Sequence, residues 1–219
     1  MATILNKLYK DFIEALDAND NGISAYPSDV KAAFNDKGIT LPSIIGGLNP
    51  DWNDAVTDAE HDQRFEKASQ LIGTVFTQKL DYFSRGWLPA RDLVLAGLND
   101  RKTVHPSGKI MVFQTSIPWK DHLFTLEDEL AISADDKPLY VLYGEGPGKN
   151  WRIQAVPVAK DSFQSRKPLP EAWRGLRDEG LSELTKIPGG VFVHASGFIG
   201  GNKTYEGVLE MAIKALEME

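Results

Sequence analysis

The chain has 219 residues, with 24 lysines and arginines against 31 aspartates and glutamates, and it contains no cysteine. The lack of cysteine excludes disulfides and thiolate metal sites, and no apolar run approaches the roughly 20 residues that a membrane-spanning helix needs. Because the net charge is −7, a binding site for a polyanion requires a local concentration of basic residues.

The first half of the chain is predicted to be mainly helical. Apolar residues at helical spacing from Leu5 to Leu16 predict an amphipathic helix that ends at Asn19-Asp-Asn-Gly22. Residues 24–56 are rich in proline, glycine, asparagine and aspartate. They predict a long loop with at most one short helix near Ser28 to Phe34.

A long helix is predicted after this loop. Thr57-Asp-Ala-Glu60 matches a capping box, and apolar residues from Phe65 to Phe83 then follow one helical face. Trp87-Leu-Pro89 is predicted to interrupt the helix, because proline lacks a backbone N–H, and a short helix is predicted to restart toward Leu98.

The second half changes in character, and strands alternate with helices. The predicted elements are a strand at 110–113, a helix at 118–130, strands at 139–143 and 151–156, a helix at 176–184, a strand at 191–193 and a helix at 204–216. The order β-α-β-β-α-β-α implies a mixed sheet covered by helices, and the chain as a whole is predicted to be α/β. We place the domain boundary between residues 1–104 and 105–219.

The stretch from Val191 to Tyr205 predicts a strand, a glycine-rich turn and a helix. Gly197, Gly200 and Gly201 would form the turn, and its free N–H groups at a helix N-terminus favour an anion such as phosphate. Lys203 would add a positive charge there. A tight strand-to-helix connection without a ligand explains the same glycines.

The segment 149–177 concentrates positive charge. Its seven basic and two acidic residues give it a net charge of +5, and the basic residues include Arg166, Lys167, Arg174 and Arg177. This segment is a candidate phosphate-binding surface. A solvated face without a ligand has the same composition.

Six sequence blocks occur in one order along the chain. They are Trp87-Leu-Pro-Ala-Arg91, Pro118-Trp-Lys-Asp-His-Leu123, Trp151-Arg-Ile-Gln-Ala-Val-Pro157, Phe163-Gln-Ser-Arg-Lys-Pro-Leu-Pro-Glu171, Trp173-Arg-Gly-Leu-Arg-Asp178 and His194-Ala-Ser-Gly-Phe-Ile-Gly-Gly201. Together they resemble the C-terminal portion of the melanocyte proliferating gene (Myg) exonuclease family, which belongs to the DHH phosphoesterase superfamily.

The resemblance implies the RNA- and phosphate-binding portion of a metal-dependent 3′-to-5′ RNA exonuclease. Such an enzyme uses Mn²⁺ or Mg²⁺, and its catalytic domain precedes a smaller substrate-binding domain. The partners implied are single-stranded RNA, or another phosphodiester substrate, and that N-terminal catalytic domain; no membrane is involved. An intracellular location is implied, in the nucleus and mitochondrion or in the cytoplasm.

The resemblance also assigns residues. Asp17 and Asp20 resemble the last aspartate motif of the catalytic domain, where a carboxylate holds a divalent metal, although a helix C-cap explains the same residues. Arg166 falls where the superfamily places a phosphate-binding arginine. Gly200-Gly201 resembles a glycine-glycine-histidine turn, but Asn202 replaces the histidine and cannot titrate near neutral pH. The full set of predicted substrate-binding residues is Arg166, Lys167, Arg174, Arg177, His194, Ser196, Gly200, Gly201, Asn202 and Lys203.

The family's upstream His-Asp clusters and its Asp-His-His triplet are absent from this sequence. A two-metal phosphoesterase needs several carboxylates and histidines around its ions. We therefore expect this chain to lack nuclease activity by itself. The alternative function is a noncatalytic binding or scaffold module for a protein or an anionic ligand.

Overall fold

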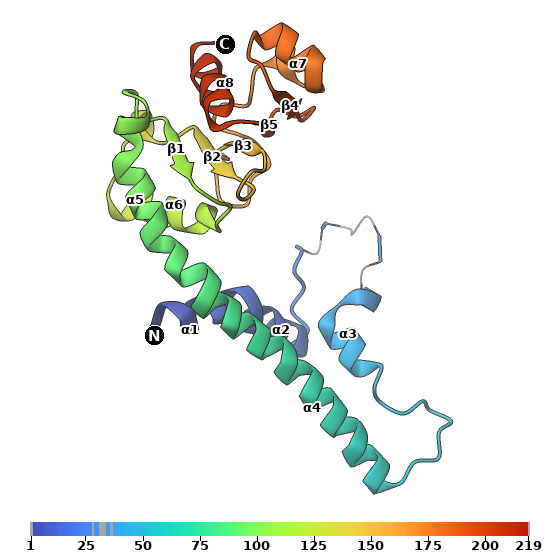
Figure 1. The fold of residues 1–219 in the computed structure, drawn as a ribbon. Coiled ribbons are helices and arrows are strands. Elements are labelled where there is room, and N and C mark those ends of the chain that lie inside the picture. The colour runs from blue at the N-terminus through green and yellow to red at the C-terminus, as the bar shows by residue number, and fades with distance from the viewer. Residues whose placement is uncertain (1, 28, 31–33, 36, 219) are drawn as a thin grey trace. The chain divides into compact units, whose positions relative to one another are not determined.

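The computed structural model describes residues 2–27, 29–30, 34–35 and 37–218 (Figure 1). The chain divides into two compact units, Met1–Leu88 and Pro89–Glu219, which we call the N-terminal and C-terminal units. This division falls before the predicted boundary at 104/105. Helix α5 (Leu88–Val104) packs into the C-terminal unit, because its residues Val94 and Leu98 are fully buried in the same cluster as Leu123.

The elements of the N-terminal unit are helical in the part of the chain that the structure describes. They are α1 (Ala2–Leu8), the π-helical turn η1 (Tyr9–Ile13), α2 (Glu14–Asp20), the short 3-10 turn η2 (Lys37–Ile39), α3 (Leu41–Gly46), α4 (Asp58–Asp81) and the π-helical turn η3 (Tyr82–Trp87). The first three are consecutive and confirm the predicted first helix, which ends before Gly22 at a φ of 68°.

Helix α4 begins as predicted. Thr57 Oγ1 accepts a hydrogen bond from the Glu60 N–H at 3.4 Å, and the Glu60 carboxylate accepts one from the Thr57 N–H at 2.7 Å, which completes the capping box. The hydrogen bond from the Thr57 backbone lowers the pKa of Glu60.

The predicted interruption at Trp87-Leu-Pro89 is wrong, because α4, η3 and α5 follow one another without a break. In η3 the helix widens, and the Leu88 N–H donates to the Phe83 carbonyl five residues earlier. This widened turn ends at Trp87, two residues before Pro89, and it lets the helix pass a residue that has no N–H to donate. The proline is therefore accommodated by a π-helical turn.

The N-terminal unit has a small core. Leu8 and Phe12 pack against Phe83 and Trp87. The rings of Phe83 and Trp87 meet edge to face, with their centres 6.2 Å apart. The predicted loop at 24–56 contains α3, which the composition did not indicate. Its start is marked by the side chain of Thr40, which accepts a hydrogen bond from the Ser43 N–H. The short helix predicted near Ser28 to Phe34 falls largely outside the described residues.

The C-terminal unit is built on a five-stranded mixed sheet. Its elements after α5 are β1 (Ile110–Phe113), α6 (Trp119–Glu129), the turn η4 (Ala134–Asp136), β2 (Tyr140–Gly144), β3 (Trp151–Ala155), the turn η5 (Glu171–Trp173), α7 (Asp178–Thr185), β4 (Gly190–Val193), β5 (Ile199–Asn202) and α8 (Tyr205–Glu217). The strand order is β1-β2-β3-β5-β4, with β1 and β2 parallel and every other pair antiparallel. The predicted α/β class is confirmed.

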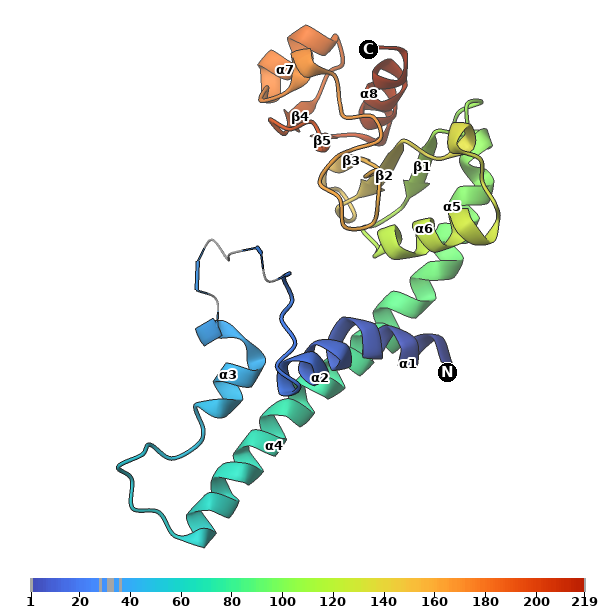
Figure 2. The ribbon, with the colours of Figure 1, turned by 180° about the vertical axis from the view of Figure 1, so that it is seen from behind.

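Helices cover the two faces of this sheet unequally. One face carries Ile153 and Val193, both buried under α8 and α7 through residues such as Met211 and Leu181. On the other face α5 and α6 pack on β1 and β2, through Met111, Phe113 and Val141 among others. Figure 2 shows α6 and α8 on opposite sides of the strands. The second face is therefore covered by these helices mainly at its β1–β2 end.

The predicted glycine turn at Gly200-Gly201 is wrong, because both residues lie in β5, between β3 and β4. Their close approach to the neighbouring strands, β3 and β4, requires glycine. A Cβ at Gly201 would lie 2.9 Å from the Trp151 carbonyl, and one at Gly200 would lie 3.0 Å from the Phe192 carbonyl. Of the three glycines predicted to form the turn, only Gly197 lies in the connection between β4 and β5, at a φ of 72°. The predicted helix at 204–216 is confirmed by α8.

Candidate nucleic-acid interface

Most of the predicted substrate-binding residues lie on or against one hairpin, formed by β4 and β5. His194 and Ser196 are at its tip, and Gly200, Gly201 and Asn202 are on β5, followed by Lys203. Arg174 lies against Gly197 at the tip, and Arg177 forms an isolated bridge with Phe192 on the outer side of β4. Tertiary structure therefore gathers residues from two sequence blocks at one place.

The hairpin tip presents a histidine and a serine to solvent. His194 Nδ1 lies 2.9 Å from Ser196 Oγ and accepts a hydrogen bond from the Ser196 N–H at 3.2 Å. Because Nδ1 accepts this N–H, the neutral imidazole carries its proton on Nε2. The ring meets Phe198 edge to face at 4.8 Å. His194 can thus donate a hydrogen bond from a fixed, exposed ring.

Two arginines flank this hairpin. Arg174 Nε donates to the Leu169 carbonyl at 3.0 Å, which holds the side chain beside the tip. Arg177 is exposed, and its guanidinium carbon lies 5.8 Å from the centre of the Phe192 ring. Among the described residues Arg177 has no ion-pair partner within 4.0 Å. Its charge is therefore available to an anionic ligand.

Strand register brings a further set of residues into one row, which we call the cross-strand row: Tyr143, Arg152, Gly201, Phe192 and Arg177. These residues are direct partners across β2, β3, β5, β4 and the bridge beyond β4. The sequence prediction did not include Arg152 or Phe192 in the site. The alternation in 151–156 was a signal that Arg152 points away from the Ile153 core, but its contact with Phe192 depends on register.

Arg166 is held inside the fold. Its Nη1 and Nη2 donate to the two carboxylate oxygens of Glu127 at 2.6 and 2.7 Å, and Nη1 also donates to the Pro138 carbonyl. The Glu127 side chain is completely buried, and that of Arg166 is only 10% exposed. A buried carboxylate requires such a partner, so the Arg166 guanidinium has a structural role, and its contact with phosphate stays a prediction.

Other predicted contacts are also used within the fold. Lys167 Nζ donates to the Leu216 carbonyl at the end of α8. Asn202 is fully buried, donates to the Pro188 carbonyl and accepts from the Thr204 N–H just before α8. The central position of β5 engages the backbone of Gly200 and Gly201 in strand pairing. These residues therefore have structural contacts within the fold, and their direct contact with substrate stays a prediction.

Lys203 is exposed but has acidic surroundings. It lines a hollow of about 260 Å³ together with Asp178, Glu179 and Glu183. These carboxylates make the local potential unfavourable for a phosphate. The hairpin tip and the Arg177 side of β4 are more suitable for a phosphodiester than the Lys203 end.

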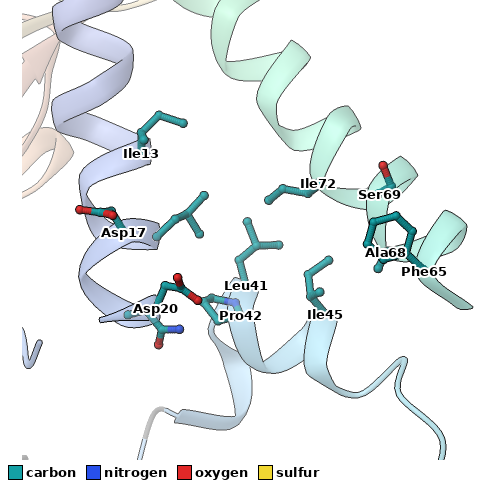
Figure 3. Close-up of a pocket in the computed structure, with 12 residues that line it drawn as sticks. Ile13, Asp17, Asp20, Leu41, Pro42, Ile45, Phe65, Ala68, Ser69 and Ile72 are labelled. Carbon is teal, nitrogen blue, oxygen red and sulfur yellow. The ribbon is translucent and has the colours of Figure 1, made fainter. Parts of the chain in front are cut away.

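The predicted metal ligands belong to the N-terminal unit. Asp17 and Asp20 are exposed on α2, and they line a groove of about 590 Å³ together with apolar residues such as Leu41 and Ile72 (Figure 3). The Asn21 side chain donates to Asp17 Oδ1 at 3.2 Å. Among the described residues no group of three or more histidines or carboxylates is placed to hold a metal ion. The two aspartates alone do not form a complete divalent-metal site.

Comparison with known proteins gives consistent matches over nearly the whole chain. The profile of the family MYG1_exonuc, described as an uncharacterised protein family (UPF0160), matches residues 1–216. The MYG1 protein of Schizosaccharomyces pombe is 47% identical over 218 residues, which cover 99% of this chain and 64% of that protein. The MYG1 protein of Saccharomyces cerevisiae is 45% identical over 217 residues, covering 97% and 63%.

A human relative carries an enzyme name. The protein named MYG1 exonuclease of Homo sapiens is 45% identical over 214 residues, which cover 97% of this chain and 55% of that protein. The chain thus spans less than two thirds of the length of these relatives. No solved structure matches it significantly. Within the described residues, no helix is both long and apolar enough to cross a membrane.

Proposed function

This chain belongs to the MYG1 exonuclease family, and from that premise we propose that it is the substrate-binding portion of a metal-dependent 3′-to-5′ RNA exonuclease. The family includes proteins named as exonucleases, which supports a nuclease-family role with a nucleic-acid substrate for this chain. The binding of single-stranded RNA by this chain is our proposal.

The observation that carries the proposal is the β4–β5 hairpin. His194 and Ser196 are exposed at its tip, Arg174 lies beside the tip, and the exposed Arg177 lies beside β4. Guanidinium, imidazole and hydroxyl groups are the donors that proteins use for phosphate and ribose oxygens. They come together here although the whole chain is acidic, with a net charge of −7.

We assign the chemical step to groups outside these 219 residues. The described residues contain no complete metal site, so the Mn²⁺ or Mg²⁺ of the proposed enzyme would take its ligands mainly from the DHH-type catalytic domain. A location in the nucleus and mitochondrion, or in the cytoplasm, belongs to the same proposal. In this view the hairpin holds the RNA while the catalytic domain cleaves it.

The test is the salt dependence of RNA binding by the purified chain. Fluorescence anisotropy with an end-labelled single-stranded oligonucleotide should show affinity that falls steeply from 50 to 200 mM salt, because phosphate contacts release counterions. Arg177→Gln should weaken binding. Lys120→Gln, which removes an exposed charge on α6, is the matched control and should have little effect.

The alternative of a noncatalytic scaffold module predicts a different result. A protein-docking surface would give no RNA binding at low salt, or weak binding that the Arg177 and Lys120 variants change equally. Either outcome would argue against the proposed function.

A further inference from the structure

The second face of the sheet contains a surface that the predicted site did not include. At its β3-β5-β4 end the side chains of Arg152, Gln154, Ile199 and Phe192 are partly exposed. On the opposite face of the same strands Ile153 is fully buried and Val193 is 2% exposed. One face of these strands is therefore core, and the other is accessible to a ligand.

The cross-strand row is the chemically distinctive part of this face. Gly201 has no side chain, and its position in the row leaves space that Arg152 occupies. A Cβ at Gly201 would lie only 2.7 Å from Arg152 Nη1. The guanidinium carbon of Arg152 lies 4.9 Å from the centre of the Phe192 ring. The absence of a side chain at Gly201 thus allows Arg152 to lie across β5 and to reach Phe192 on β4.

The row extends beyond the edge of the sheet. Arg177 is the backbone partner of Phe192 in an antiparallel bridge, and such partners present their side chains on the same face. Its guanidinium carbon lies 5.8 Å from the same ring. Phe192 is therefore associated with two guanidinium groups, one from each side of the row.

The two arginines differ in charge balance. Arg152 Nε and Nη2 contact Glu145 Oε1 at 2.8 and 2.6 Å, so its positive charge is neutralised. Arg177 has no such partner among the described residues. Arg152 consequently contributes a planar group whose Nε and Nη2 contact Glu145, whereas Arg177 contributes both a plane and a free charge. Burial raises the pKa of the Tyr143 hydroxyl, so this end of the row is neutral at pH 7.

We propose that the Phe192–Arg177 end of the cross-strand row is a stacking site for one unpaired nucleobase of single-stranded RNA, and that Arg177 binds the phosphate of that nucleotide. This inference rests on the proposed function and specifies how the bound strand is held. Aromatic rings and guanidinium planes are the surfaces on which proteins stack splayed bases.

The composition of the row favours a nucleotide over other occupants. A stacked base needs a planar surface that has charge at one margin only, because its phosphate lies to one side. Glu145 would repel a phosphate at the Arg152 end, whereas Arg177 would attract one at the outer end. The RNA strand would therefore cross the row with its phosphate at Arg177 and its base over Phe192.

The experiment uses the 219-residue chain and a single-stranded RNA that contains 2-aminopurine, whose fluorescence is quenched when it stacks. Anisotropy reports affinity, and quenching reports stacking. Phe192→Leu should weaken binding about 5- to 100-fold and abolish the quenching, as expected for the loss of one base-aromatic stack. Phe163→Leu changes a fully exposed phenylalanine outside the row and is the matched control.

Two further variants separate charge from stacking. Arg177→Gln should weaken binding and reduce the slope of log affinity against log salt by about one. Arg177→Lys should restore the slope but only part of the quenching, because an ammonium has no plane. Arg177 is exposed, so these variants remain informative if circular dichroism shows that Phe192→Leu does not fold.

The outcomes distinguish the stacking site from the proposed function. If the wild-type chain binds RNA and Arg177→Gln weakens this binding, but Phe192→Leu retains the wild-type affinity and quenching, the stacking site is refuted while RNA binding by the chain stands. If the wild-type chain does not bind RNA, both are refuted. Loss of quenching in Phe192→Leu with unchanged Phe163→Leu supports the stacking site.

Discussion

Removal of one partner from the Arg166–Glu127 pair should destabilise the C-terminal unit strongly. Glu127 has no exposed side-chain surface and receives two short hydrogen bonds from Arg166. Breaking a buried ion pair costs about 3–5 kcal/mol, because it leaves a charge uncompensated. Lys137 Nζ, 3.4 Å from Glu127 and 30% exposed, keeps part of the neutralisation in Arg166→Met. We therefore expect the Arg166→Met variant to lose about 3 kcal/mol of its free energy of unfolding.

This free energy corresponds to a measurable shift in melting temperature. For a unit of about 130 residues, an unfolding entropy of about 2.1 cal/mol/K per residue means that 3 kcal/mol lowers Tm by about 11 °C. Thermal unfolding at pH 7, followed by circular dichroism, gives this value directly. Arg91→Met, which removes a more exposed arginine paired with Glu129, is the control and should lower Tm much less.

The double variant Arg166→Met/Glu127→Leu tests whether Arg166 is structural or binds substrate. Replacing both charges by apolar groups of similar volume removes the unpaired charge, and we expect stability within about 1–2 kcal/mol of the wild type. If Arg166 has only a structural role, this double variant should also bind RNA with the affinity of the wild type. A stable double variant whose RNA binding remains at least tenfold weaker would refute our reasoning and place Arg166 in the substrate site.

Three other predictions follow from the structure. Gly201→Ala should lower stability by about 1–3 kcal/mol, because its Cβ would collide with the Trp151 carbonyl, whereas Gly180→Ala on α7 has open space and should raise it by about 0.5–1 kcal/mol; urea unfolding measures both. The Tyr140 hydroxyl is buried without a hydrogen-bond partner in the described part of the chain, and burial raises its pKa above the usual range. As the pH rises, the Tyr140 hydroxyl therefore ionises first in the unfolded chain, and the free energy of unfolding should fall above about pH 10. The variant Tyr140→Phe should show a smaller fall, and at pH 7 it should be no less stable than the wild type. Finally, the chain incubated with end-labelled RNA and Mn²⁺ should show no chelator-sensitive cleavage; cleavage that disappears in Asp17→Ala/Asp20→Ala would contradict our assignment of catalysis to other residues.

The local elements of this chain could be predicted from its sequence because their signals lie within a few residues. The capping box of Thr57 and Glu60 fixed the start of α4, and the spacing of Val208, Met211 and Ala215 identified α8. Alternation from Trp151 to Ala155 identified β3 and its two faces. The family was also recognisable, since its blocks are continuous stretches of sequence.

Some local signals had two structural explanations, and the sequence did not choose between them. Glycine permits a turn and also permits close approach of neighbouring strands, so Gly200 and Gly201 fitted a phosphate-binding turn as well as a central strand. Only the presence of β3 and β4 on either side decided for the strand. Pro89 likewise indicates a helix break from sequence, but in the structure a π-helical turn accommodates it and the helix continues.

The candidate site depended on tertiary structure. Arg166 and Glu127 are 39 residues apart, and a basic residue in a basic segment gives no indication that a buried carboxylate will hold it. Arg152 on β3 and Phe192 on β4 are distant in the chain and meet because β5 places Gly201 between them. The sequence determined which groups were available for the proposed binding of RNA. Strand order, register and burial decided which remain free, because these arise only when segments distant in the chain pack together.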